Sequence, residues 1–183
     1  ASAGGYLSYE NIADKATVAG VEIEIRKNLF VRPVSNAAHG MNKLSLGLNG
    51  SYIYTNAKMP LATVTTGSQL EGAAPWIVNF DLSHNFTKGE RSFVNTLVLN
   101  YVSDKIYTIG TQGYQDIMEQ GVLTLDFVSQ AKLNKHLSLN LKARNLLNPS
   151  YKLSRKANEN GEKVILNDYK KGINISLGVS CTF

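Results

Sequence analysis

The chain ends in the stretch Lys171-Gly-Ile-Asn-Ile-Ser-Leu-Gly-Val-Ser-Cys-Thr-Phe183, and the pattern of this stretch decides the predicted fold. Apolar residues occupy every second position from Ile173 to Phe183, and polar or small residues occupy the positions between them. Such strict alternation predicts a β-strand with one apolar face and one polar face. At about 3.3 Å per residue, the strand is long enough to cross a bilayer at a tilt.

The same alternation recurs along the chain and predicts six further strands. The seven strands are expected at about residues 16–29, 43–55, 75–86, 92–102, 121–131, 137–147 and 171–183. Residues 1–14 are rich in Gly and Ser and weakly patterned, so they are interpreted mainly as loop. The apolar faces are ladders of Leu, Val, Ile and Phe with few exceptions, such as Asn95. We therefore expect an all-β, antiparallel fold.

The connections between these strands alternate in length. Short or medium turns follow the first, third and fifth strands, and long stretches follow the others, at 56–74, 103–120 and 148–170. The aromatic side chains are also distributed by strand end. Near the long stretches lie Tyr52, Tyr54, Trp76 and Tyr101, and near the short turns lie Phe86, Phe93 and Phe183. Both regularities are typical of a transmembrane β-barrel, with interfacial aromatic girdles and turns that are short on one side only.

Composition narrows the class further. The chain has 183 residues, of which 43% are hydrophobic and 18% charged, and this balance excludes a disordered protein. Its mean hydropathy of −0.15 does not separate a barrel from a soluble domain, because barrel strands alternate. The single cysteine excludes an internal disulfide. The net charge of +5 lacks interleaved aromatic platforms, so no nucleic-acid partner is expected.

Several segments resemble TonB-dependent outer-membrane receptors. Thr17–Lys27 is similar to a strand with a Gly-Val-Glu-Leu-Glu-type signature, and Asn145–Tyr151 resembles the Asn-Leu-Leu/Phe-Asn-x-x-Tyr segment that ends the penultimate strand. Leu70–Trp76 is similar to the start of an intervening strand. The C-terminal spacing resembles the signal read by the outer-membrane assembly machinery, and its residues are Ser176, Gly178, Cys181 and Phe183. The overall likeness is closest to receptors of the Bacteroidetes.

This resemblance implies the C-terminal part of a larger, plugged barrel of 22 strands. Single-chain bacterial barrels have an even strand number, so seven strands do not close. An open edge in lipid would leave backbone groups unpaired, at several kcal/mol each. The plug and the remaining strands are therefore expected to lie outside these 183 residues. The implied location is the outer membrane of a Gram-negative bacterium, with the C-terminus in the periplasm and the long loops outside.

The implied function is nutrient import driven by TonB-derived energy, with this chain supplying wall, external loops and assembly signal. The implied partners are outer-membrane lipid and lipopolysaccharide, the rest of the barrel and the plug, the TonB system acting through that plug, and a surface lipoprotein. An iron siderophore, haem, a glycan and a peptide all remain open as ligand. Two alternatives are kept: a porin-like or structural barrel without TonB coupling, and a soluble β-sandwich that binds carbohydrate.

Polar side chains on the predicted strands are candidates to face the lumen or the plug. They are Glu22, Glu24, Arg26, Asn79, Asp81, Asp126, Lys142 and Arg144. Glu22 and Glu24 would lie about 7 Å apart on one face, within the roughly 5–10 Å of a glycosidase carboxyl pair. A lumen wall with alternating charges is the preferred interpretation, so no catalytic residue and no enzymatic activity are expected.

The long loops are the predicted place for ligand contact, because loops on a rigid scaffold carry recognition. The candidates are Tyr107, Tyr114, Asp116, Arg155 and Lys156. Cations of 148–170 could bind an anionic iron chelate or neutralise lipopolysaccharide phosphates, and the second reading is preferred. The three histidines, His39, His84 and His136, have no neighbours at ligand spacing, so neither metal nor cofactor is expected.

Overall fold

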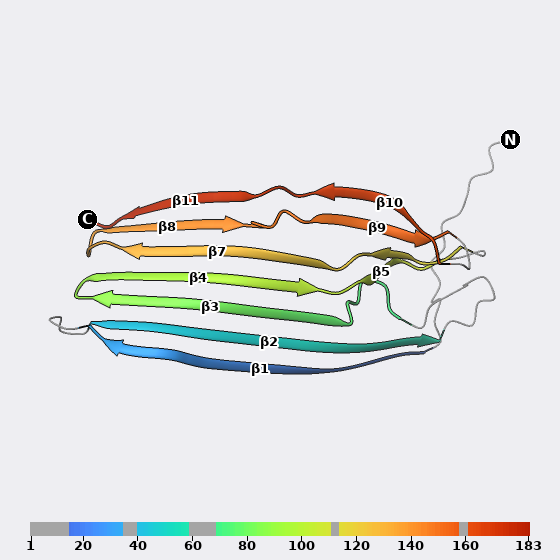
Figure 1. Cartoon of the computed structure of the whole chain (residues 1–183), viewed down its shortest axis with the longest axis horizontal. Coiled ribbons are helices and arrows are strands. Elements are labelled where there is room, and N and C mark those ends of the chain that lie inside the picture. The colour runs from blue at the N-terminus through green and yellow to red at the C-terminus, as the bar shows by residue number, and fades with distance from the viewer. Residues whose placement is uncertain (1–14, 35–39, 59–68, 111–113, 158–160) are drawn as a thin grey trace.

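The chain folds into two antiparallel sheets that follow one another along the same axis (Figure 1). The computed structural model describes residues 15–34, 40–58, 69–110, 114–157 and 161–183. The main sheet contains, in spatial order, β1 (Lys15–Pro33), β2 (Met41–Lys58), β3 (Trp76–Lys88), β4 (Arg91–Val102), β7 (Val122–Lys132), β8 (Leu137–Arg144) and β11 (Asn174–Cys181). The end sheet contains β10 (Lys163–Lys170), β9 (Ser150–Lys156), β6 (Ile117–Glu119) and β5 (Lys105–Thr108).

Each face of the main sheet can be read from its register, because directly opposed residues on neighbouring strands point to the same side. One apolar row runs through Ile25, Leu48, Phe80, Leu99 and Leu125. The next row along the strands is polar and runs through Glu24, Asn49, Asn79, Asn100 and Thr124. The alternation seen in single strands therefore adds up to one apolar face and one polar face across the sheet.

The apolar face has no second layer against it in the described ranges. Ile23 on β1 is 62% exposed and Leu177 on β11 is 71% exposed. Among the described residues, the main contacts between elements join neighbouring strands within each sheet. A soluble sandwich would bury these side chains between two sheets, so that alternative is wrong. Among residues with described positions, none belongs to a helix that could span a bilayer.

Two segments predicted as loops, 103–120 and 148–170, contain the strands of the end sheet, and this is a correction. β5 and β6 form within the first segment, and β9 and β10 within the second. These strands continue the hairpins of the main sheet through further backbone hydrogen bonds. Polar side chains lie on both of their sides, so the period-two signal is weak. The loop interpretation relied on that signal alone.

The predicted bounds also shift where the two sheets meet. β8 ends at Arg144 rather than at residue 147, and β11 begins at Asn174 rather than at 171. Between the sheets Asn145 (φ 58°) and Asn148 (φ 43°) have left-handed backbones, and so does Gly172 (φ 80°). A strand cannot continue through such residues. The loop predicted at 1–14 lies outside the described residues.

A small core lies at the junction, on the side of β2 and β5. The segment 69–75 crosses there, and Gly72 N–H donates to the Ile106 carbonyl at 2.8 Å. Leu70 N–H donates to Thr55 Oγ1 at 3.1 Å. The buried side chains at this end are Thr55, Ala57, Ala74, Ile106 and Ser154. The opposite end of the main sheet carries the C-terminus and the turns of the β3–β4 and β7–β8 hairpins (Figure 1).

Candidate functional site

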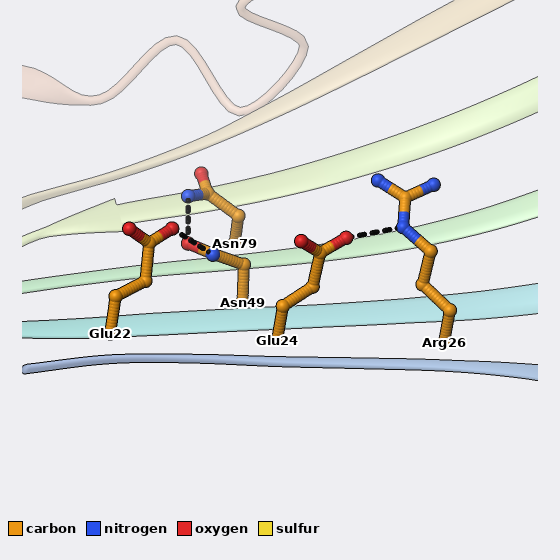
Figure 2. A network of polar contacts seen from close by, with 5 residues as sticks. All are labelled: Glu22, Glu24, Arg26, Asn49 and Asn79. Carbon is orange, nitrogen blue, oxygen red and sulfur yellow. Dashed lines mark hydrogen bonds and ion pairs between the residues drawn. The ribbon is translucent and has the colours of Figure 1, made fainter.

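The polar face of the main sheet carries a ladder of hydrogen-bonded side chains that runs from β1 to β4, and Figure 2 shows its members on β1, β2 and β3. Asn49 Nδ2 donates to Glu22 Oε1 at 2.6 Å, and Asn79 Nδ2 donates to Asn49 Oδ1 at 3.3 Å. Asn100 Nδ2 donates in turn to Asn79 Oδ1. Asn49 and Asn79 each donate one bond and accept another, so a continuous chain of hydrogen bonds links Glu22 on β1 to Asn100 on β4. We call these four side chains the amide ladder.

An ion pair lies beside the amide ladder on β1. Glu24 and Arg26 project to the same side as Glu22, and the Arg26 guanidinium donates to the Glu24 carboxylate. Both side chains are more than half exposed, so solvent screens the pair and it contributes little to stability. Its importance is spatial, since it places a fixed cation on the polar face.

A hollow of about 450 Å³ opens next to this ion pair, at the position of Gly47. Its lining includes Arg26, Gly47, Asp81, Ser83 and Thr96. Gly47 is directly opposed to both Arg26 and Asp81. Any Cβ at Gly47 would overlap the Asp81 carboxylate. Because Gly47 has no side chain, the Asp81 carboxylate can lie beside it on the polar face, close enough to Arg26 for electrostatic attraction.

The other three predicted wall residues lie on β7 and β8, apart from the amide ladder. Asp126 Oδ1 accepts the backbone N–H of Asn145 at 2.8 Å and thereby fixes the end of β8. Lys142 is opposed to Val128 and Ser176, and Arg144 is opposed to Asn174. The structure thus gives Asp126 a structural partner, whereas Lys142 and Arg144 remain exposed cations.

Side-chain hydrogen bonds hold the residues with left-handed backbones at the junction in place. Asn145 Nδ2 donates to the Gly172 carbonyl at 2.7 Å, and Gly172 N–H donates to Asn148 Oδ1 at 3.1 Å. Asn148 N–H closes the turn on the Asn145 carbonyl at 2.9 Å. The Asn-Leu-Leu-Asn-Pro-Ser-Tyr segment therefore ties the strand before the junction to the strand that returns through it.

Aromatic and cationic side chains gather on the end sheet. The rings of Tyr151 and Tyr169 stack with centroids 5.5 Å apart, and Lys171 Nζ lies 3.8 Å from the Tyr151 centroid. Lys105 and Glu119 form an ion pair of 3.3 Å. A hollow of about 220 Å³ lies where the two sheets meet, lined by Asn100, Lys105, Glu119, Tyr151 and Lys171 among others. It joins the polar face of the main sheet to the end sheet.

The residues predicted as external-loop contacts are only partly brought together. The Arg155 guanidinium lies 5.2 Å from the Tyr114 ring centroid. Asp116, Arg155 and Lys156 line a hollow of about 340 Å³. Tyr107 lies on β5, apart from that lining, and is 52% exposed. As a correction, Tyr107, Arg155 and Lys156 are strand residues, because their segments extend the hairpins of the main sheet.

The predicted assembly-signal residues lie on or beside β11. Ser176 and Gly178 are opposed to Lys142 and Asn140 on the polar face, and Cys181 is opposed to Leu137 on the apolar face. Thr182 N–H donates to the His136 carbonyl, so pairing continues one residue beyond the strand. Phe183 follows as the fully exposed last residue. Cys181 is exposed and free, as a small side chain on the apolar face.

Sequence reasoning missed Asn49, Asn100, Gly47, Tyr151 and Lys171. The amides looked like ordinary polar-face residues, because only the register shows that they fall in one line. Gly47 could have been suspected, since a glycine inside a strand often marks a close approach. Among the described residues, no cluster of His, Cys, Asp or Glu is suited to a metal ion.

Comparison with known families identifies the class of protein. The sequence model of the family described as TonB dependent receptor-like, beta-barrel matches residues 1–146. This range is well over half of the chain, which therefore belongs to the TonB-dependent receptor β-barrel family. No curated protein and no solved structure matches the chain.

Family membership and geometry agree. The family consists of non-enzymatic transporters, and the exposed Glu22 and Glu24 are engaged with Asn49 and Arg26. An antiparallel sheet with one apolar face is what a fragment of such a barrel requires. The family places the chain in outer-membrane transport in a Gram-negative bacterium.

Proposed function

We propose that this chain forms wall, external hairpins and assembly signal of an active transporter that imports a scarce or bulky nutrient with TonB-derived energy. The observation that carries the proposal is the main sheet, a single layer with an uncovered apolar face and a polar face crossed by the amide ladder. A barrel wall between hydrocarbon and a plugged lumen needs both faces at once.

The proposed orientation turns the polar face to the lumen and plug. All four carboxylates of the main sheet, those of Glu22, Glu24, Asp81 and Asp126, share that face by register. A charged residue on the lipid side at mid-membrane costs about 2–4 kcal/mol for Arg or Lys and somewhat less for Asp or Glu. Their common side supports the assignment, as do Asn79, Lys142 and Arg144 on the same face.

The proposed vertical orientation puts the C-terminus in the periplasm and the end sheet outside. The rings of Tyr52 and Trp76 lie 4.5 Å apart near the end sheet, and those of Phe86 and Phe93 lie 6.3 Å apart near the hairpin turns. Two aromatic pairs at opposite ends of one apolar face support a pair of interfacial girdles.

The proposed partners follow from this orientation. The amide ladder and the Gly47 hollow face the plug, through which TonB acts. The cations of β9 and β10 face lipopolysaccharide phosphates, and Tyr107, Tyr114, Asp116, Arg155 and Lys156 remain candidates for ligand contact. A surface lipoprotein partner and a Bacteroidetes-like lineage are part of the same proposal. A porin-like role without TonB coupling fits the family assignment poorly.

The orientation is tested by two neighbouring substitutions in the complete receptor. Leu99 and Asn100 are adjacent on β4 and point to opposite faces. We expect Leu99→Arg to reduce assembled receptor in the outer membrane strongly, at about 2–4 kcal/mol, and Asn100→Arg to reduce it little. Heat-modifiable mobility of membrane extracts measures assembly. Equal tolerance of both changes would contradict the orientation.

A further inference from the structure

A patch of polar side chains interrupts the apolar face close to the short hairpin turns. By register, Asn42 on β2, His84 on β3, Asn95 on β4 and Ser129 on β7 all lie on that face. His84, Asn95 and Ser129 form one row, and their row neighbours on β2 and β8 are Leu44 and Leu141. All four polar side chains are half-buried. We call them the apolar-face patch.

Hydrogen bonds within the patch occupy both amide oxygens and leave both amide NH₂ groups free. His84 Nε2 lies 2.9 Å from Asn42 Oδ1, and since that oxygen only accepts, Nε2 carries the proton. Ser129 Oγ donates to Asn95 Oδ1 at 2.7 Å. The amide NH₂ groups of Asn42 and Asn95 have no partner among the described residues. The patch therefore presents four N–H bonds toward the side that the proposed orientation assigns to lipid.

The surroundings of the patch are cationic and aromatic. Arg32 is directly opposed to Asn42 on this face, and its guanidinium lies 5.5 Å from the Phe30 ring centroid. The last pair of the β3–β4 hairpin is Lys88 and Arg91. Every carboxylate of the main-sheet strands lies on the opposite face. A ligand that fits must therefore offer negatively charged acceptors.

The order of cationic, hydrogen-bonding and apolar side chains along the apolar face narrows the class of ligand further. Cations lie at the end, the donor-rich patch comes next with the Phe86 and Phe93 rings beside it, and an apolar ladder continues through Leu82 and Phe80. A phospholipid has the same order: a phosphodiester, then glycerol ester carbonyls, then acyl chains. A protein partner would not need this polarity gradient along the strand direction.

We propose that the apolar-face patch binds one phospholipid of the periplasmic leaflet, with Arg32 at the phosphodiester and the amides of Asn42 and Asn95 at the ester carbonyls. The proposal rests on the orientation given under the proposed function. The Leu99 and Asn100 substitutions test that orientation separately, so a failure of lipid binding alone leaves the transporter assignment intact.

The test uses the complete receptor, delipidated in detergent and titrated with phosphatidylglycerol under native mass spectrometry. In the double variant Arg32→Gln/Asn95→Leu we expect about tenfold weaker binding of the tightest lipid, equivalent to about 1.4 kcal/mol. The matched control is Lys43→Gln/Asn85→Leu, because Lys43 and Asn85 are directly opposed on the polar face next to Asn42 and His84. The control should bind as the wild type does.

Binding of other lipids and of a single variant tests the proposal further. Phosphatidylethanolamine should bind within about threefold of phosphatidylglycerol, since both carry the phosphodiester that the charge-assisted hydrogen bonds would recognise. If the double variant fails to assemble, Arg32→Gln alone near the end of β1 should still weaken binding measurably. Unchanged lipid binding in the variants would overturn the proposal. So would preference for lipopolysaccharide over phospholipid, or a changed oligomeric state of the variant with lipid binding intact.

Discussion

The strands of the end sheet extend the hairpins of the main sheet, but the two sheets differ in how their side chains are patterned and exposed. On β11 of the main sheet, large apolar side chains such as Leu177 remain mostly exposed, and they alternate with polar or small residues. On the end sheet, Ile106 is 4% exposed and Ser154 is 2% exposed, although β5 carries Lys105 and β9 carries three cations. In the described part of the chain, the main sheet has an apolar side that nothing covers, whereas the end sheet contributes to a small protein core.

This difference shows that the surrounding solvent, rather than strand pairing, dictates the pattern. Hydrocarbon on one side disfavours charges there, and the carboxylates of the main-sheet strands all lie on the other side. Where water reaches both sides, a hairpin keeps its backbone hydrogen bonds while its side chains vary freely. The end sheet accordingly carries ion pairs and stacked tyrosines among its side chains.

The largest expected contrast comes from placing one charge on each sheet. Leu125→Lys on the apolar face of β7 should destabilise the assembled receptor by about 2–4 kcal/mol, whereas Tyr107→Lys on β5 should change stability by less than about 0.5 kcal/mol. Urea titration of the receptor in lipid vesicles would measure both. A similar loss at both positions would show that the two sheets share one environment.

The junction between the sheets should respond to backbone strain. Gly172 has φ 80°, so Gly172→Ala should cost about 1–2 kcal/mol. Gly50→Ala on β2 is the control, because its added Cβ would meet nothing within 4 Å. Thermal melting should fall for the first variant and stay near wild type for the second. An unchanged melting temperature in both would mean that the junction is not held in this conformation.

A substitution inside the main sheet should disturb the polar face selectively. Gly47→Ala forces the Asp81 carboxylate away from its position beside Gly47, at a cost of about 1 kcal/mol, the low end for overpacking. Gly50→Ala, on the other face of β2, meets open space and serves as the control. Melting temperatures in detergent compare the two, and equal values would argue against a fixed Asp81.

The smallest effect is expected for an ion pair of the end sheet. Lys152 Nζ lies 3.7 Å from Asp168 Oδ2, and both side chains are about one-third or more exposed. Asp168→Asn should therefore cost only about 0–0.5 kcal/mol and less still at high salt. A double-mutant cycle with Lys152→Met measures the coupling. A coupling above about 1 kcal/mol would indicate that a partner excludes water there.

The comparison also explains which predictions succeeded. Each of the seven predicted ranges overlaps a strand of the main sheet, because a sheet with one apolar and one polar face imposes a period that the residues themselves display. The strands β9 and β10 were interpreted as a charged loop, since nothing in their composition separates a solvated hairpin from a coil. Arg155 and Lys156 were therefore named as contacts without their strand setting.

The candidate site residues also fall into two groups: those that the pattern of a single strand predicts, and those that depend on how strands pair. Glu22, Glu24, Arg26, Asn79 and Asp81 were assigned to one polar side by counting positions, and the register places them on one face. Their partners Asn49 and Asn100 depend on how neighbouring strands are aligned, which no single strand records. Gly47 acquires its meaning only when Asp81 is set opposite it.

By itself, the amino-acid order determined the strands of the main sheet and the two faces, because side chains of a strand alternate without reference to any neighbour. Tertiary structure decided which residues meet across strands: the amide ladder, the Gly47 hollow, the locked junction and the apolar-face patch. These depend on register, and register is a property of pairs of strands.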